Sequence, residues 1–447
     1  MKTNSVLKLF MILLVTSTII SCSNDDDFGA ITEEDETQLI DFTIQTSLSS
    51  DIGEADLEDV TISLTNTTTG EIFETSTNEN GTAIFDQLEI GLYAAIATLT
   101  LTKEEFENKL GYTPDTEEVT FNGAQENIVI NVNVTSTNIE LTTGKIGDLL
   151  IKQVYYAGSG FDGASFRDQF IEIYNNSNEI LYADGLLVAQ VYGSIFTGVA
   201  DYTLENGQFD WTKSPSNQVG ADANDKYAYA DFVYQIPGNG TTYPINPGEG
   251  IVIATNAYNH KETLIESDGW ESTVTDPSLT IDLSEADFEG YLVDYITSSD
   301  GYPGTWDVQN NNVPDLEIIH FKSGKDMVLN TGGADSFVIF THDTPNDLPT
   351  YLSPDTSDDS LYMQIPVENI VDAVEVNTED PTNLYPRQLP TALDAGYAYV
   401  PNGYFSSQSV IRKVEKEVNG RKVLFDTNNS SVDFTYLDMA SPGAFVE

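Results

Sequence analysis

The sequence predicts an all-β protein built from two successive β-sandwiches. Short runs such as Phe42–Gln45 and Val60–Leu64 alternate apolar and polar residues, which is the period of strands with one buried face. Asn80-Gly81 lies between two such runs and indicates a hairpin turn, because Asn and Gly tolerate positive φ. The continuous apolar runs Ile251–Ile253 and Ser336–Phe340 have the length of strands that are covered on both faces.

The first 21 residues have the pattern of an export signal that ends at the only cysteine. Lys2 and Lys8 give a basic start, Leu9–Val15 an apolar core, and Ile19–Cys22 a lipobox. The apolar core is too short to span a bilayer as a helix. Residues 1–21 resemble a bacterial lipoprotein signal, which implies cleavage before Cys22 and acylation of that cysteine, with palmitate as one such acyl chain.

Residues 22–40 are polar and acidic, and they predict a flexible tether. A short polar and acidic group follows the cysteine directly: Ser23, Asn24, Asp25, Asp26 and Asp27. This group resembles the signal that sends lipoproteins of Bacteroidota to the outer face of the outer membrane. A tether that is merely polar would have a similar composition, so both interpretations stay open.

The charge of the chain excludes one large class of partners. The sequence holds 72 acidic and 18 basic residues, a formal net charge of −54. Nucleic acid is therefore not expected as a partner, because binding to phosphates requires positive charge. The acids are spread along the chain and 40% of its residues are hydrophobic, which indicates a folded protein with an acidic surface.

Residues 41–140 predict the first sandwich. The further runs Thr82–Phe85 and Leu92–Ile96 have strand periodicity, Lys103–Leu110 predicts one short helix, and Ile128–Val132 predicts a closing strand. The order of strands and turns resembles the prealbumin-like, carboxypeptidase-regulatory β-sandwich of bacterial surface proteins. No catalytic group of residues occurs there, so a structural spacer is favoured over a ligand-binding domain.

Residues 145–447 predict a second, larger sandwich. Phe170–Tyr174 gives a strand that ends in the polar turn Asn175–Asn178. Together with Ile146–Tyr155, Ile245–Ala254 and the blocks near the C-terminus, these residues resemble a lamin-tail domain, which has an immunoglobulin-like fold. Two stretches near 192–243 and 258–315 are rich in Gly, Asn, Asp and aromatic residues and are interpreted as long loop insertions.

The complete arrangement of lipoprotein signal, regulatory-like sandwich and enlarged lamin-tail region resembles the DUF4876 family of Bacteroidota. That family name carries no assigned activity. The resemblance implies an all-β surface lipoprotein and leaves its ligand open.

Sequence support for catalysis is weak. His260, His320 and His342 stand apart and form no HExxH or other spaced pair, although His342 beside Asp343 is the best of the three for metal binding. The chain has no G-x-S-x-G motif and no second cysteine. The many acids make a pair of catalytic carboxylates impossible to identify from sequence. The chain is therefore not expected to be an enzyme.

Calcium is the more plausible metal for such an acidic surface, because it prefers oxygen ligands. Three turn-rich segments carry candidate ligands: Asp222, Asn224 and Asp225; Asp307 and Asn310; Asp426 and Asn428. None matches the EF-hand loop. The alternative is that these side chains cap turns by bonding their own backbone.

Aromatic residues in the two insertions suggest a contact surface. The candidates for partner binding are Trp211, Trp270, Tyr302 and Trp306. Exposed Tyr and Trp on polar loops supply contact area at a small entropic cost. The alternative is that they line the faces of strands.

These observations lead to one expected function and two rivals. We expect a non-enzymatic, surface-exposed outer-membrane lipoprotein that acts as an accessory or binding subunit of an outer-membrane complex, with a TonB-dependent transporter for nutrients or metals as the barrel partner. The choice of a transporter as the partner rests on family-level analogy alone. The rivals are a calcium-bridged adhesion or matrix protein and a module associated with a secreted hydrolase.

Overall fold

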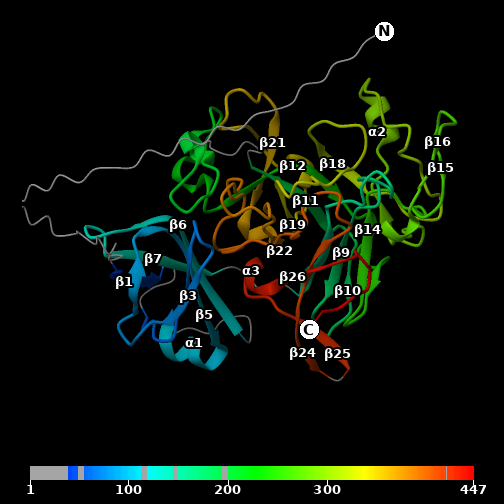
Figure 1. The fold of residues 1–447 in the computed structure, drawn as a ribbon. Coiled ribbons are helices and arrows are strands. Elements are labelled where there is room, and N and C mark those ends of the chain that lie inside the picture. The colour runs from blue at the N-terminus through cyan, green and yellow to red at the C-terminus, as the bar shows by residue number, and fades with distance from the viewer. Residues whose placement is uncertain are drawn as a thin grey trace, which may run out of the picture. The chain divides into compact units, whose positions relative to one another are not determined.

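The computed structural model describes residues 39–48, 55–111, 118–143, 148–193, 200–418 and 420–446. The predicted signal, Cys22, the group 23–27 and all but the last two residues of the predicted tether lie outside these ranges. In the described ranges the regular secondary structure is mostly β-strand, which confirms the predicted all-β class (Figure 1). No helix in this part of the chain is long and apolar enough to cross a membrane.

The first seven strands form one sheet in the order β3-β2-β5-β6-β7-β1-β4. Their bounds are β1 Leu39–Leu48, β2 Thr61–Asn66, β3 Ile72–Ser76, β4 Thr82–Glu89, β5 Gly91–Thr102, β6 Glu118–Ile130 and β7 Ser136–Thr143. Burial alternates along β1, where Phe42 and Ile44 point into the core. The predicted turn joins β3 to β4, and Gly81 adopts a φ of +69° there.

The predicted short helix is α1, Lys103–Leu110. It begins with a capping box, in which the Thr102 hydroxyl accepts a hydrogen bond from the Glu105 amide and the Glu105 carboxylate accepts one from the Thr102 amide. It ends at Gly111, whose φ of +79° is the left-handed conformation that glycine adopts without strain. Phe106 packs into the core of the first seven strands.

The larger part of the chain folds into two facing sheets. One has the order β20-β21-β12-β11-β19-β22, with β18 paired to β12, and the other has the order β17-β14-β9-β8-β23-β26. The first consists of β11 Leu187–Tyr192, β12 Tyr227–Gln235, β18 Glu317–Phe321, β19 Asp335–Phe340, β20 Thr350–Leu352, β21 Leu361–Pro366 and β22 Ile370–Val374. The second consists of β8 Leu149–Tyr155, β9 Phe170–Asn175, β14 Gly250–Ala254, β17 Phe288–Glu289, β23 Ser409–Arg412 and β26 Phe434–Leu437.

Shorter strands and helices lie outside these two sheets. They are β10 Leu181–Tyr182, β13 Pro244–Ile245, β15 Leu264–Ile265, β16 Glu271–Ser272, β24 Val414–Val418, β25 Arg421–Leu424, α2 Val293–Ser298 and α3 Ser430–Asp433. Six short 3-10 helices complete the described structure: η1 Ala200–Tyr202, η2 Trp211–Lys213, η3 Gly220–Ala223, η4 Pro277–Leu279, η5 Pro345–Asp347 and η6 Val367–Asn369.

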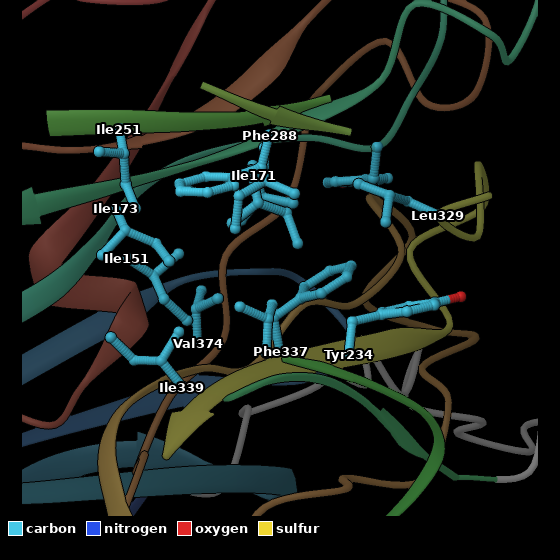
Figure 2. Packing of buried hydrophobic residues seen from close by; sticks show 14 of the residues in the cluster. Ile151, Ile171, Ile173, Tyr234, Ile251, Phe288, Leu329, Phe337, Ile339 and Val374 are labelled. Atoms are coloured by element: carbon cyan, nitrogen blue, oxygen red, sulfur yellow. The ribbon is translucent and has the colours of Figure 1, made fainter. Parts of the chain in front are cut away.

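Apolar side chains from both sheets fill the space between them. Figure 2 shows Ile151, Ile171 and Ile251 of one sheet opposite Phe337 and Ile339 of the other. All five belong to one buried cluster, as expected for a sandwich whose inner faces interdigitate. The apolar runs that the sequence analysis singled out are therefore core strands.

A buried arginine joins the two sheets beside this core. Arg412 on β23 is 1% exposed, and its guanidinium forms two hydrogen bonds of 2.8 and 2.9 Å with the carboxylate of Asp372 on β22. The same guanidinium lies 3.3 Å from Asp433 and 3.4 Å from Asp426, and it donates to the carbonyl of Ile151 on β8. The planar guanidinium suits this multiple pairing, which a lysine ammonium would not reproduce.

The interpretation of 192–243 as a long loop is wrong in its second half. Residues 227–235 form β12, which pairs with β11, β18 and β21 in its sheet. The strand escaped notice because its buried positions are filled by Ala and Tyr, whose alternation is weak, and because Gly, Asn and Asp surround it. The stretch 258–315 is mainly irregular, with β15, β16, β17 and α2 within it.

Candidate functional site

Two of the four predicted contact aromatics are strongly exposed. Trp270 is 67% exposed in the β15–β16 hairpin, and Tyr302 is 86% exposed in the segment after α2. The two loops are tied together, because the Ser267 amide donates to the Thr305 carbonyl at 2.9 Å. The hydroxyl of Thr305 also donates to the buried carboxylate of Glu266. These exposed rings therefore stand on a hydrogen-bonded frame.

Arg167 completes this frame from outside the two loops. Its guanidinium lies 3.5 Å from the Glu266 carboxylate, which also accepts a hydrogen bond from the Ser272 hydroxyl. Trp306 acts as a brace, since its indole N–H donates to Asp326 at 2.6 Å and its ring meets Phe166 edge-on. Trp306 is half-buried, so the expectation of a freely exposed loop contact at this position is wrong.

Trp211 is 1% exposed, which overturns its interpretation as an exposed loop residue. It lies on η2, and its ring stacks on Tyr229 with centroids 3.9 Å apart. It also meets Phe209 and Tyr362 edge-on. Polar neighbours in the sequence hide this position, whereas its burial depends on β12 and β21, which are distant along the chain.

Several of the predicted calcium ligands form hydrogen bonds with backbone groups of the protein. The Asn224 side chain donates to the Phe209 carbonyl at 2.7 Å, while Asp222 and Asp225 are exposed. Asp307 accepts a hydrogen bond from the Leu292 amide at 2.9 Å. Asn310 donates to the carbonyls of Ala257 and Ser284.

The last two candidate calcium ligands, Asp426 and Asn428, also have structural roles. Asp426 pairs with Arg412, and Asn428 adopts a positive φ of 54° in a turn. Over the residues that the structure describes, no three histidine, cysteine or acidic side chains are grouped so that they could hold a metal ion. Asn310 also accepts a hydrogen bond from the Asn312 amide, as the turn interpretation expects, whereas Asn224, Asp307 and Asp426 contact groups that are distant in the sequence.

The three histidines also stay apart in the fold. His260 is buried, its Nε2 lies 3.0 Å from the Asn256 carbonyl, and burial lowers its pKa to about 3. His320 lies on β18 within 3.0 Å of the Leu361 carbonyl. His342, the best metal candidate in the sequence, accepts a hydrogen bond from the Thr344 amide through Nδ1.

The sequence analysis missed a cavity at one end of β11. It has a volume of about 620 Å³, within the usual range for small-ligand sites. We call it the aspartate pocket. Its lining consists of Tyr192, Asp231, Phe232, Lys322, Val328, Asn330, Asp335, Asp355, Ser357, Asp358 and Asp359.

One wall of the aspartate pocket is an aromatic and ionic cluster. The rings of Tyr192 and Tyr362 stack with centroids 4.2 Å apart, and both hydroxyls contact Asp358. The Lys322 ammonium donates to the Tyr362 hydroxyl and lies 3.5 Å from the Asp358 carboxylate. Although burial opposes it, hydrogen bonds from Tyr362 and Ser360 lower the pKa of Asp358 to about 2, so this carboxylate is ionised at neutral pH.

Two further carboxyl groups of the pocket are more than nine-tenths buried. Asp231 on β12 is 6% exposed, and Asp335, the first residue of β19, is 8% exposed. Burial raises the pKa of Asp335 to about 7, and burial together with the charge of Asp335 raises the pKa of Asp231. A charged residue inside the aromatic run of 227–234 was the one sequence signal that could have pointed here.

Two crystal structures of bacterial proteins are similar to this chain. A crystal structure of a DUF4876 family protein from Bacteroides thetaiotaomicron is 26% identical, covering 89% of this chain and 94% of that one, with a TM-score of 0.48. A crystal structure of a DUF3823 family protein from Bacteroides ovatus is 13% identical, covering 48% of this chain and 98% of that one, with a TM-score of 0.14. No curated protein matches significantly. The family model described as "Protein of unknown function (DUF4876)" matches residues 246–441, which confirms the predicted resemblance over this part of the chain.

Proposed function

We propose that this chain is a non-enzymatic binding protein, anchored in the outer membrane through Cys22 and displayed on the cell surface. It acts as an accessory subunit of an outer-membrane complex, with a TonB-dependent transporter for nutrients or metals as its barrel partner. The observation that carries the proposal is the pair of exposed rings, Trp270 and Tyr302, on two loops that are hydrogen-bonded to each other.

The hydrogen bonds between these two loops favour a role of the exposed rings in binding a partner. Large aromatic residues dominate the binding energy of many protein interfaces when they become buried against a partner. A side chain held on an ordered loop loses less conformational entropy on binding than one on a mobile loop. The ties from Ser267 and Glu266 to Thr305 supply that order.

Copurification tests the partner. The full chain, tagged at its C-terminus, is extracted with detergent from outer membranes and captured, and the copurifying proteins are identified by mass spectrometry. We expect a β-barrel transporter, and we expect the double variant Trp270→Ala/Tyr302→Ala to recover about tenfold less of it, the effect of losing one hot spot.

Tyr404→Ala is the matched control for this experiment, because Tyr404 is also strongly exposed at 66% but lies outside the two linked loops. It should leave recovery unchanged. If the double variant recovers as much barrel protein as the control, or if no barrel protein copurifies with the unaltered chain, the proposed function is wrong.

The anchor has a separate test. Cys22→Ala should leave the protein uncleaved or release it from the membrane fraction during carbonate washing, because Cys22 is the single acylation site in the sequence. Replacing Asp25, Asp26 and Asp27 with Asn should retain lipidation but reduce proteolysis on intact cells. Unchanged membrane retention in the first case, or full protease access in the second, would contradict anchoring or surface display respectively.

A further inference from the structure

Asp231 occupies an irregular position in its strand. The register between β11 and β12 pairs Gln190 with Phe232 and Val191 with Ala230, so Asp231 has no partner on β11 and forms a β-bulge. On its other side β12 changes neighbours here, since residues up to Ala230 pair with β21 and those from Phe232 pair with β18. Bulges re-aim a side chain, and they occur frequently beside binding sites.

This bulge places the side chain of Asp231 in the wall of the pocket, where one of its carboxyl oxygens lacks a hydrogen-bond partner in the described part of the chain. Asp231 is 6% exposed, and its Oδ1 has no hydrogen-bond partner among the described residues. A buried carboxylate oxygen without a partner costs free energy that a donor from a ligand would recover. Because Asp231 also lines the cavity, its unsatisfied carboxyl oxygen points to a ligand that donates hydrogen bonds.

The charges of the aspartate pocket restrict that ligand further. Five aspartates line the cavity with a single lysine. The Lys322 ammonium is bonded to Tyr362 and paired with Asp358, and it lies 4.5 Å from the centre of the Tyr192 ring. One ammonium thus faces five carboxyl groups, and because burial raises the pKa values of Asp231 and Asp335, a bound cation would stabilise the ionised form of both.

We propose that the aspartate pocket binds a small organic cation, an amine or a guanidinium compound, whose positive group donates hydrogen bonds to Asp231 beside Asp335. The rings of Tyr192 and Phe232 in the lining suit the carbon chain of such a ligand. Neither the family resemblance nor the transporter proposal contains this site.

Other ligand classes fit less well. A phosphate or carboxylate compound would meet repulsion from five aspartates. A divalent cation requires several oxygen ligands at short range, and the structure groups no three acidic or histidine side chains of the described residues for that purpose. A sugar could satisfy Asp231 but would leave the excess charge unbalanced.

The test uses isothermal titration calorimetry on the purified full chain in detergent, with putrescine as the probe. Its matched neutral probe is 1,4-butanediol, which has the same carbon chain but hydroxyl groups in place of the two ammonium groups. We expect putrescine to bind and butanediol to bind about tenfold more weakly or not at all, because charge-assisted hydrogen bonds are roughly twice as strong as neutral ones.

Asp231→Asn and Asp359→Asn give a matched pair of variants, since each replaces one carboxyl group of the lining by an amide while only Asp231 is buried. Asp231→Asn should weaken putrescine binding about tenfold or more, and Asp359→Asn should weaken it less than about threefold. A urea melt of each variant checks its folding. If Asp231→Asn does not fold, Asp335→Asn takes its place with the same expected loss.

Several outcomes would overturn the proposal. These are the absence of putrescine binding in the millimolar range, equal binding of butanediol, and equal effects of the two variants. Binding of calcium or of a monosaccharide in place of putrescine would assign the pocket to another ligand class. The copurification experiment depends on Trp270 and Tyr302 and does not involve the pocket, so either proposal can fail without the other.

Discussion

Replacing Asp307 with Asn should make the stability of the protein less dependent on pH between about pH 5 and pH 8. Asp307 is 3% exposed, and burial, strengthened by the charges of Asp326 and Glu289, raises its pKa to about 8. The Leu292 amide donates to it, and the carbonyl oxygen of Asn can accept the same bond. The substitution therefore removes the ionisable group while keeping the acceptor.

The sign of the effect follows from proton binding in the two states. Between the unfolded pKa of about 3.9 and the folded pKa of about 8, the folded state holds the proton and the unfolded state does not. The stabilisation is thus fully present below about pH 4 and is lost as pH rises through 8. At about 1.4 kcal/mol for each pH unit, Asp307 lowers the free energy of unfolding by at most about 4 kcal/mol between pH 5 and pH 8.

Urea melts of the unaltered chain and of Asp307→Asn at pH 5 and pH 8 measure this difference. The unaltered chain should lose stability over this interval, and Asp307→Asn should lose up to about 4 kcal/mol less. The residual slope comes from other buried acids, among them Glu289, Glu375 and Asp335, whose pKa values burial raises to about 7. Asp343→Asn, an exposed position, controls for the loss of one charge. Equal slopes for the Asp307 variant and the unaltered chain would refute the reasoning.

Three further outcomes follow from the packing. Trp211→Ala should destabilise the protein by about 3–5 kcal/mol in denaturant melts, while Trp270→Ala should stay within about 0.5 kcal/mol, because only Trp211 is buried; equal losses would contradict this assignment. Arg412→Met should cost about 3–5 kcal/mol by stranding the Asp372 carboxylate, and adding Asp372→Asn should restore part of it; purely additive losses would argue against their coupling. Calcium and magnesium at matched ionic strength should raise the melting temperature equally, since the described residues hold no group of metal ligands; a larger shift with calcium would reveal a specific site.

Elements with strong local signals could be predicted from the sequence. The strands around Phe42, Ile171 and Ile253 carry β-branched and aromatic residues at strand spacing. The α1 helix begins at a capping box and ends at Gly111. In each case the residues that decide the structure are neighbours in the chain, so pattern and structure agree.

The candidate sites depend on contacts that local patterns do not contain. Trp211 and Trp270 sit in similarly polar stretches, yet one packs on Tyr229 and Tyr362 while the other faces solvent. The aspartate pocket joins residues from 192 to 359 and depends on a one-residue bulge in β12. A shift of register is fixed by pairing with distant strands, so the position of Asp231 could not be inferred from its own neighbours.

The bonds of Arg412 also bear on the order in which the chain folds. Its side chain joins Ile151 and Asp372 to Asp426 and Asp433, groups separated by up to 282 residues. Likewise β8, an early strand of the large sandwich, lies between β9 and β23 in its sheet. The two sheets therefore cannot lock together until the last forty or so residues are present, and contacts of such long sequence separation form slowly. If the chain is exported as proposed, its large sandwich stays open for most of the passage across the membrane, because the strands that close it come last.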